Sequence, residues 1–248
     1  MSAADWLTAR PVAHRGLHDA TTGVIENTPS AFAAAIAANY AIECDLQITA
    51  DGEAMVHHDD ALGRLTEGVG RLDTMTSADL KRVRYKAGAD RMITVGDLCD
   101  LVAGRVTLVI ELKGRFDGDR RLVARAAEVL ARYRGPAALM SFDPAPIATL
   151  RTIAPTLARG IVAESHYRPR DWSQLSSGTR RALAYFQHAL RTRPQFIAYS
   201  VKDLPAAVPL IARTVFGLPL LTWTVRTDAD RERAVRFADQ MIFEGFRP

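Results

Sequence analysis

The sequence predicts an α/β fold of the (β/α)8 class, a TIM barrel. Short apolar runs alternate with longer segments at helical spacing, which is typical of parallel strands joined by right-handed crossovers. About eight such units fit into the 248 residues, the usual size of this barrel. No Gly-x-Gly-x-x-Gly motif follows the first strand, which disfavours the alternative, an open doubly wound sheet.

The individual elements follow from apolar periodicity and from capping residues. The first expected helix has Thr28 placed as its N-cap and Pro29 at its first position, as helix starts prefer. The expected strands are 10–16, 41–48, 105–113, 137–142, 158–163, 195–200, 219–225 and 240–245. The expected helices are 26–40, 94–104, 118–133, 143–155, 173–191, 203–216 and 228–238.

Two segments depart from this alternation. After the strand 41–48, an Asp-Gly turn and a short return strand are expected within "DGEAMVHHDD", which is typical of a hairpin. Residues 60–93 contain glycine turns and one short helix near Ser77, so we interpret them as an insertion in a single domain spanning 1–248. The chain stops three residues after "FEG", so we expect the closing C-terminal helix to be missing.

Composition narrows the class of protein. The chain is 48% apolar and 24% charged, which favours a globular core. We see no apolar signal-peptide core and no transmembrane run, and we expect a cytoplasmic protein. Cys44 and Cys99 are not expected to pair. The net charge of +4 comes from arginine without a dense basic run, so we expect no nucleic-acid partner and leave an anionic substrate open.

Polar residues gather where two expected strands end. Glu43 and Asp45 lie two residues apart on one strand, so they share a face, and Glu111 and Lys113 do so on the next core strand. Neighbouring strands bring all four to the C-terminal mouth of the barrel. The three carboxylates could form buried ion pairs with Lys113 and Arg15. They also suit a hard divalent ion such as Mg²⁺ or Ca²⁺ better than zinc, because no histidine or cysteine lies at close metal-ligand spacing.

Histidines also lie at this mouth. His14 and Arg15 end the first strand, and two adjacent histidines, His57 and His58, follow the return strand. Extended neighbours point to opposite faces, so only one of the pair can aim at the mouth. Histidines that exchange protons near pH 7 suggest displacement at an anionic centre, with phosphate diesters the natural case.

Several blocks, taken together and in order, resemble the glycerophosphodiester phosphodiesterase family. They are "AHRG" (13–16), "ENTPSAF" (26–32), "IECDLQITADGEAMVHHDDALGRLT" (42–66), "IELK" (110–113), "SFDP" (141–144) and "WTV" (223–225). The resemblance covers nearly the whole chain. It implies a TIM barrel with a small insertion after the second strand.

The resemblance also implies a role for each residue at the mouth. It implies one divalent cation, Mg²⁺ or Ca²⁺ with Mn²⁺ as an alternative, held by Glu43, Asp45 and Glu111. It places the catalytic histidine directly before an aspartate, which selects His58, and pairs it with His14. It further implies Arg15 on the phosphate, with Lys113 and Trp223 lining the substrate site.

The implied reaction releases an alcohol and glycerol 3-phosphate from a small-molecule phosphodiester. Attack by water or by the substrate's own hydroxyl stays open, as does the oligomeric state. Lysophospholipid or sugar phosphodiester substrates, and a non-catalytic phosphate-binding barrel, are the alternatives. Arg226 and the "FEGFRP" ending depart from the family pattern, which leaves the preferred head group open.

Overall fold

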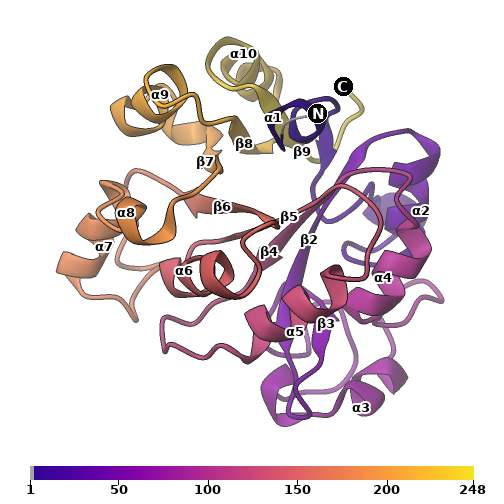
Figure 1. Cartoon of the computed structure of the whole chain (residues 1–248). Coiled ribbons are helices and arrows are strands. Elements are labelled where there is room, and N and C mark those ends of the chain that lie inside the picture. Colours follow the sequence, from indigo (N-terminus) through magenta and orange to yellow (C-terminus); the bar gives the residue numbers. More distant parts are fainter. Residues whose placement is uncertain (1–2) are drawn as a thin grey trace.

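The computed structural model describes residues 3–248, and eight parallel strands form a closed barrel with helices around it (Figure 1). The strand order around the barrel is β1-β9-β8-β7-β6-β5-β4-β2, and β1 closes it by pairing with both β9 and β2. The predicted (β/α)8 class is therefore confirmed.

The elements lie close to their predicted places. The barrel strands are β1 (Val12–Ala13), β2 (Ala41–Ile48), β4 (Leu108–Leu112), β5 (Ala137–Ser141), β6 (Ala158–Ala163), β7 (Phe196–Ser200), β8 (Leu220–Val225) and β9 (Gln240–Phe243). The helices are α1 (Ala3–Leu7), α2 (Pro29–Ala37), α3 (Ser77–Arg82), α4 (Val95–Val102), α5 (Arg121–Leu130), α6 (Pro144–Ile153), α7 (Ser177–Ala184), α8 (Ala189–Thr192), α9 (Ala207–Thr214) and α10 (Asp228–Phe237).

One predicted helix was wrong in its extent. The segment 173–191 was expected to be continuous, but it divides into α7 and α8. Between them Phe186 has φ 52°, a left-handed backbone conformation that an α-helix cannot contain. The helical period of the apolar residues continues across this break, so periodicity alone did not reveal it.

The second strand continues into a hairpin. β3 (Ala54–Val56) pairs antiparallel with β2, with Leu46 opposite Val56. Residues 60–93 then form a short 3-10 helix η2 (Leu72–Thr74), the helix α3 and several isolated bridges. A small apolar cluster of this segment covers β3 and contains Met55, Leu72, Leu80, Tyr85 and Met92.

Every residue of β2 is buried. The two faces of the strand differ in the polarity of their surroundings. Cys44 belongs to the apolar cluster shared with the surrounding helices, while Glu43 lines a cavity inside the barrel mouth. Asp45 lies beside Glu111 of β4 in the parallel register. The sheet geometry therefore brings acidic side chains from two strands to one point.

Both ends of the described chain contact residues of the barrel domain. Leu7 of α1 is buried in an apolar cluster with Val12 and Ala41. After β9, residues 244–248 form no helix, and the carbonyl of Pro248 accepts a hydrogen bond from the Tyr40 hydroxyl. In residues 3–248 no helix is long and apolar enough to cross a membrane.

Candidate active site

Three buried carboxylates form the centre of the mouth. Glu43 and Asp45 come from β2 and Glu111 from β4, and one oxygen of each lies within 4.8 Å of the others. Glu43 and Asp45 are almost fully buried, and Glu111 is 8% exposed. Carboxylates at this separation repel one another unless a proton or a cation offsets their charge.

Two basic side chains offset part of that charge. The Lys113 ammonium bridges Asp45 Oδ1 at 2.8 Å and Glu111 Oε1 at 2.7 Å. Arg15 places Nε 3.3 Å from Asp45 Oδ2, and its backbone N–H donates to Glu43 Oε2 at 2.9 Å. The structure therefore contains the ion pairs of Lys113 and Arg15 with the buried carboxylates that the sequence analysis considered.

The basic groups do not neutralise the cluster completely. Glu26 lies 2.7 Å from Arg15 Nη1 and takes up part of that charge. Burial, with the nearby charges of Asp45 and Glu111, holds the pKa of Glu43 well above its ordinary value. Burial alone would raise the pKa of Asp45 too, but Lys113, His58 and Arg15 hold it below its ordinary value. The excess charge and the all-oxygen donor set fit a hard divalent cation.

Asn27 is a site residue that the sequence reasoning missed. Its Nδ2 donates to Asp45 Oδ2 at 2.9 Å, and its Oδ1 accepts from the Asp45 backbone N–H at 3.3 Å. Its φ of 57° turns the chain into α2, whose N-cap is Thr28 as predicted. The signal was the polar pair Glu26-Asn27 beside this cap.

Gly16 makes the close approach of this turn to β1 feasible. A Cβ at Gly16 would lie 2.9 Å from the backbone carbon of Ala31, and its φ is 80°. Glycine alone adopts this conformation without strain and leaves the required space. The "HRG" sequence thus places Arg15 beside the carboxylates.

The two predicted histidines both line the cavity that contains Glu43 and Glu111. His14 Nε2 is 3.9 Å from Glu43 Oε2, and its Nδ1 lies 2.5 Å from Glu244 Oε2. His58 lines the same cavity, with Nδ1 2.8 Å from Asp59 Oδ1. Each ring therefore has one nitrogen held by a carboxylate and one free for chemistry.

His57 has different surroundings. It is buried with 2% of its surface exposed, its backbone N–H donates to the Asp45 carbonyl, and it does not line the cavity. Burial holds its pKa below the ordinary value. The two adjacent histidines thus point to different environments, as the extended chain predicts.

Glu244 was also missed, although its segment was recognised as a departure from the family. It accepts from Arg226 Nε at 3.1 Å and from Nη2 at 2.9 Å, in addition to its contact with His14. Burial would raise the pKa of Glu244, but His14 and Arg226 hold it well below its ordinary value. Arg226 therefore has a carboxylate partner and is not a free loop arginine.

The cavity itself has a volume of about 240 Å³ and two unlike walls. The charged wall carries the histidines, Glu43, Glu111, Arg15 and Lys113. The other wall is mainly apolar and is formed by Met140, Phe142, Val162, Trp223 and Ile242, with Thr224 and Arg226 beside them. Trp223 packs edge-on against Phe142, with ring centroids 5.4 Å apart.

Residues 60–93 supply none of the described residues that line this cavity. Arg64 of this segment pairs with Asp59 at 2.6 Å and with Glu26 at 2.6 Å, and neither partner lines the cavity. Through these contacts the insertion supports the side chains next to His58 and Arg15. Its effect on the cavity is therefore indirect.

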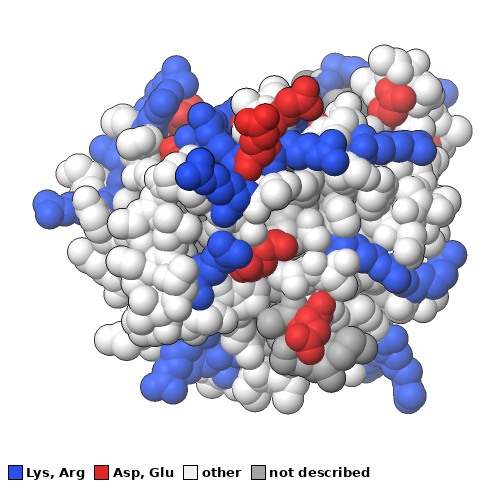
Figure 2. All heavy atoms as spheres, turned by 90° about the horizontal axis from the view of Figure 1, so that it is seen from above, with Lys and Arg blue, Asp and Glu red and all other residues white. Residues whose placement is uncertain are grey.

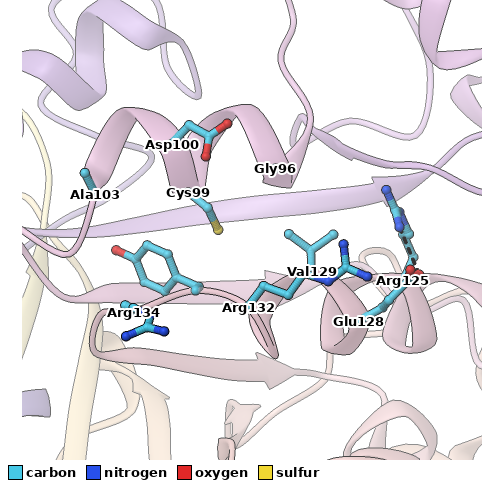
Figure 3. A pocket seen from close by; sticks show the side chains of 10 residues that line it. Gly96, Cys99, Asp100, Ala103, Arg125, Glu128, Val129, Arg132 and Arg134 are labelled. Atoms are coloured by element: carbon cyan, nitrogen blue, oxygen red, sulfur yellow. Dashed lines mark hydrogen bonds and ion pairs between the residues drawn. The ribbon is translucent and has the colours of Figure 1, made fainter.

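A second cavity of about 500 Å³ lies outside the barrel, between α4 and α5 (Figure 3). Arg125 there is paired with Glu128 at 2.9 Å, as the dashed line in the figure marks. Burial raises the pKa of the Cys99 thiol to about 11, so it carries little thiolate near neutral pH. This cavity lacks the paired acid, base and cation-binding groups of the barrel mouth.

The outer surface is rich in arginine without a continuous basic band on the face that Figure 2 shows. Basic side chains are scattered over that face, and acidic ones lie among them. Many arginines are paired with carboxylates, such as Arg213 with Asp239 at 2.7 Å. This pattern is typical of a solvated surface.

Comparison with known proteins places the chain next to one family. The model of the glycerophosphoryl diester phosphodiesterase family matches residues 14–246. Probable glycerophosphodiester phosphodiesterase 1 of Mycobacterium tuberculosis is 29% identical over 170 residues, which cover 59% of this chain and 61% of that relative. The match thus spans about three fifths of the relative's length.

Solved structures show the same barrel. A crystal structure from Silicibacter pomeroyi, assigned to the same family, has a TM-score of 0.75 at 25% identity and covers 94% of this chain and 89% of its own. An Oleispira antarctica phosphodiesterase, solved with its product sn-glycerol-3-phosphate, has a TM-score of 0.76 at 19% identity and covers 96% and 94%. The second likeness concerns the fold alone.

Proposed function

The chain belongs to the glycerophosphoryl diester phosphodiesterase family, a family of phosphoric diester hydrolases, and we propose that it hydrolyses glycerophosphodiesters to an alcohol and glycerol 3-phosphate with a divalent cation. One observation carries this proposal. Two histidines line one cavity together with members of a cluster of three buried carboxylates. The product bound by the Oleispira antarctica phosphodiesterase is of the same chemical class.

Glu43, Asp45 and Glu111 are the residues that would hold the cation. Their donor atoms are close enough to share one ion. When bound, such an ion stabilises the negative charge that develops on the phosphoryl oxygens. Mg²⁺ and Ca²⁺ are the preferred candidates, with Mn²⁺ as an alternative, because oxygen donors suit all three.

His14 and His58 form the acid–base pair of the proposed mechanism. One imidazole takes the proton from the attacking oxygen as the new P–O bond forms. The other donates a proton to the alcohol oxygen as its P–O bond breaks. The attacking oxygen belongs either to water or to a hydroxyl of the substrate, which would first give a cyclic phosphate.

Arg15 and Lys113 would bind the phosphate, since both are cationic and both line the cavity. Arg15 presents a planar guanidinium that suits phosphate oxygens. The apolar wall with Trp223 would contact the carbon atoms of the bound alcohol or glycerol. The two walls together favour an amphipathic substrate with one anionic centre.

We include a cytoplasmic location in the proposal. Cys44 and Cys99 are unpaired and buried, and unpaired thiols are usual in a reducing compartment. Fractionation of cells that produce the tagged chain tests this location.

A release assay tests the proposed reaction. Purified protein is incubated with glycerophosphodiesters, lysophospholipids and sugar phosphodiesters, each with and without chelator, and the released alcohol and phosphomonoester are measured. We expect turnover of glycerophosphodiesters that stops with chelator. Preference for lysophospholipids or sugar diesters would change the substrate class. Binding of phosphate ligands without any turnover would support the non-catalytic barrel instead.

A further inference from the structure

Glu244 and Arg226 form a structural unit behind His14. Glu244 follows β9, Arg226 follows β8, and His14 follows β1. Glu244 Oε2 lies 2.5 Å from His14 Nδ1, and the Arg226 guanidinium donates to both Glu244 oxygens at 3.1 and 2.9 Å. The carboxylate thus lies between an imidazole and a guanidinium whose side chain is 53% exposed.

The chemistry of this contact determines where His14 carries its proton. An ionised carboxylate only accepts hydrogen bonds, so a neutral His14 must place its proton on Nδ1. Its Nε2 then carries a lone pair. That nitrogen points toward the carboxylate cluster, 3.9 Å from Glu43 Oε2. A base whose free nitrogen faces the reacting atoms is in the productive tautomer.

Other groups near Glu244 do not compete for this role at the same distance. His18 Nε2 is 4.0 Å from Glu244 Oε2, beyond hydrogen-bond length. The Glu244 side chain is 21% exposed and that of His14 is 11% exposed. The contact is therefore largely shielded from water, which would otherwise compete for the same hydrogen bonds.

We propose that Glu244, oriented by Arg226, is a positioning residue that holds His14 in the Nδ1–H tautomer with Nε2 facing the cavity. This inference rests on the proposed function, because it assigns a cause to the reactivity of one of its two histidines.

The substitution Glu244→Gln separates positioning from simple packing. Glutamine has nearly the same shape but only one acceptor oxygen, whereas the carboxylate accepts from Arg226 Nε on Oε1 and from both Arg226 Nη2 and His14 Nδ1 on Oε2. Where the NH2 group takes the Oε2 position, it donates to His14 Nδ1 and moves the neutral ring's proton to Nε2. The expected result is loss of the fixed Nδ1–H tautomer in an unchanged fold.

Nitrogen-15 NMR of histidine-labelled protein reads the tautomer directly. The chain has six histidines, and the signals of His14 are assigned by their absence in His14→Ala. Spectra are taken above the ordinary histidine pKa of about 6.5, where neutral rings dominate. We expect Nδ1–H for His14 in the parent and a substantial Nε2–H population in Glu244→Gln. An Nε2–H tautomer in the parent would overturn the proposal, even if Glu244→Gln failed to fold.

Kinetics give an independent measurement. Glu244→Gln is expected to lower kcat about tenfold or more, because the carboxylate that supports the protonated ring is lost and part of the population has the unproductive tautomer, while KM changes by less than about threefold. Glu244→Asp keeps a carboxylate and should recover part of kcat and the parent tautomer. In a His14→Ala background, Glu244→Gln should cause little further loss, because residues that act as a unit are not additive.

The matched control is Glu232→Gln on α10, which removes the same charge at an exposed position. It should leave the tautomer and kcat unchanged. If Glu244→Gln is folded and keeps both the parent tautomer and the parent kcat, Glu244 is not a positioning residue. If no diester is turned over by the parent, the proposed function fails, and the NMR result still decides the positioning role.

Discussion

The two histidines of the cavity are held by different parts of the molecule. His14 is held by Glu244, 230 positions away in the sequence, at the point where β1 meets β9. His58 is held by its neighbour Asp59, which Arg64 contacts from the insertion. Both supports have the same order of groups, an imidazole, a carboxylate and a guanidinium.

The difference lies in what each support requires. The His14 support exists only when the barrel is closed, because its three residues come from three strands. The His58 support needs only a short stretch of chain, and its contact of imidazole with carboxylate is more exposed, since the His58 side chain is 33% exposed and that of His14 is 11%. The two arginines do not differ in this way, because Arg64 is 46% and Arg226 is 53% exposed. Exposed ion pairs are weakened by solvent. We therefore expect the His14 support to be the stiffer one.

Cation removal should have the largest effect, because the carboxylate cluster shares one cavity with both histidines. Chelation should abolish turnover, and added Mg²⁺, Ca²⁺ or Mn²⁺ should restore it, as measured by product release and by elemental analysis of the protein. Glu111→Gln should bind the cation more weakly while staying folded, because one ligand charge is lost. Full turnover in chelator by metal-free protein would contradict the proposed cation site.

Removal of either histidine should have the next largest effect. His14→Ala and His58→Ala should each lower kcat by at least about a hundredfold, since a general acid–base group contributes ~10²–10⁴-fold. His57→Ala is the matched control, because it removes an adjacent imidazole outside the cavity. Its loss of turnover should follow its loss of thermal stability. An inactive, folded His57→Ala beside an active His58→Ala would reverse the assignment.

Asp59→Asn tests the weaker of the two supports. It should lower kcat by less than Glu244→Gln does, because His58 is more exposed and water can replace the lost acceptor. Burial would raise the pKa of Asp59, but Arg64 and His58 lower it to about 2. The parent side chain is therefore ionised at neutral pH. Equal losses from Asp59→Asn and Glu244→Gln, measured under the same conditions, would show that the two supports do not differ.

Shortening the insertion should have the smallest effect on turnover. Thr66 and Tyr85 face each other in an antiparallel bridge, so residues 67–84 can be replaced by a two-residue Gly-containing turn that keeps Arg64. The excision removes Leu72 and Leu80, so Met55, Tyr85 and Met92 lose packing partners, and each apolar side chain that becomes exposed costs roughly 1.5–3 kcal/mol of stability. A variant that stays folded should keep most of the turnover of a small diester.

The control for that excision is Arg64→Ala in the full-length chain. It removes only the contact to Asp59 and Glu26, so it separates this contact from the bulk of the insertion. Circular dichroism and thermal unfolding show whether each variant folds. A strong loss of turnover in a folded excision variant that keeps Arg64 would mean that residues 67–84 take part in the site more directly.

Local features were available from the sequence because they depend on neighbouring residues. The spacing of Glu43 and Asp45 determines that they share a face of one strand. Thr28 and Pro29 determine where α2 starts, and the order His57-His58-Asp59 separates the two histidines. The alternation of apolar runs also predicted the barrel. These features follow from backbone periodicity and helix capping, which depend on local sequence and not on the tertiary fold.

Only the tertiary structure decided which distant groups meet. Barrel closure through β1 and β9 brings Glu244 to His14, and the positive φ of Asn27 brings its amide to Asp45. The break at Phe186 likewise interrupts a regular helical period. Nothing in local spacing encodes such contacts, because they depend on the packing of all eight strands around one axis. The sequence by itself thus determined which residues could react, and the closed barrel determined how each is held.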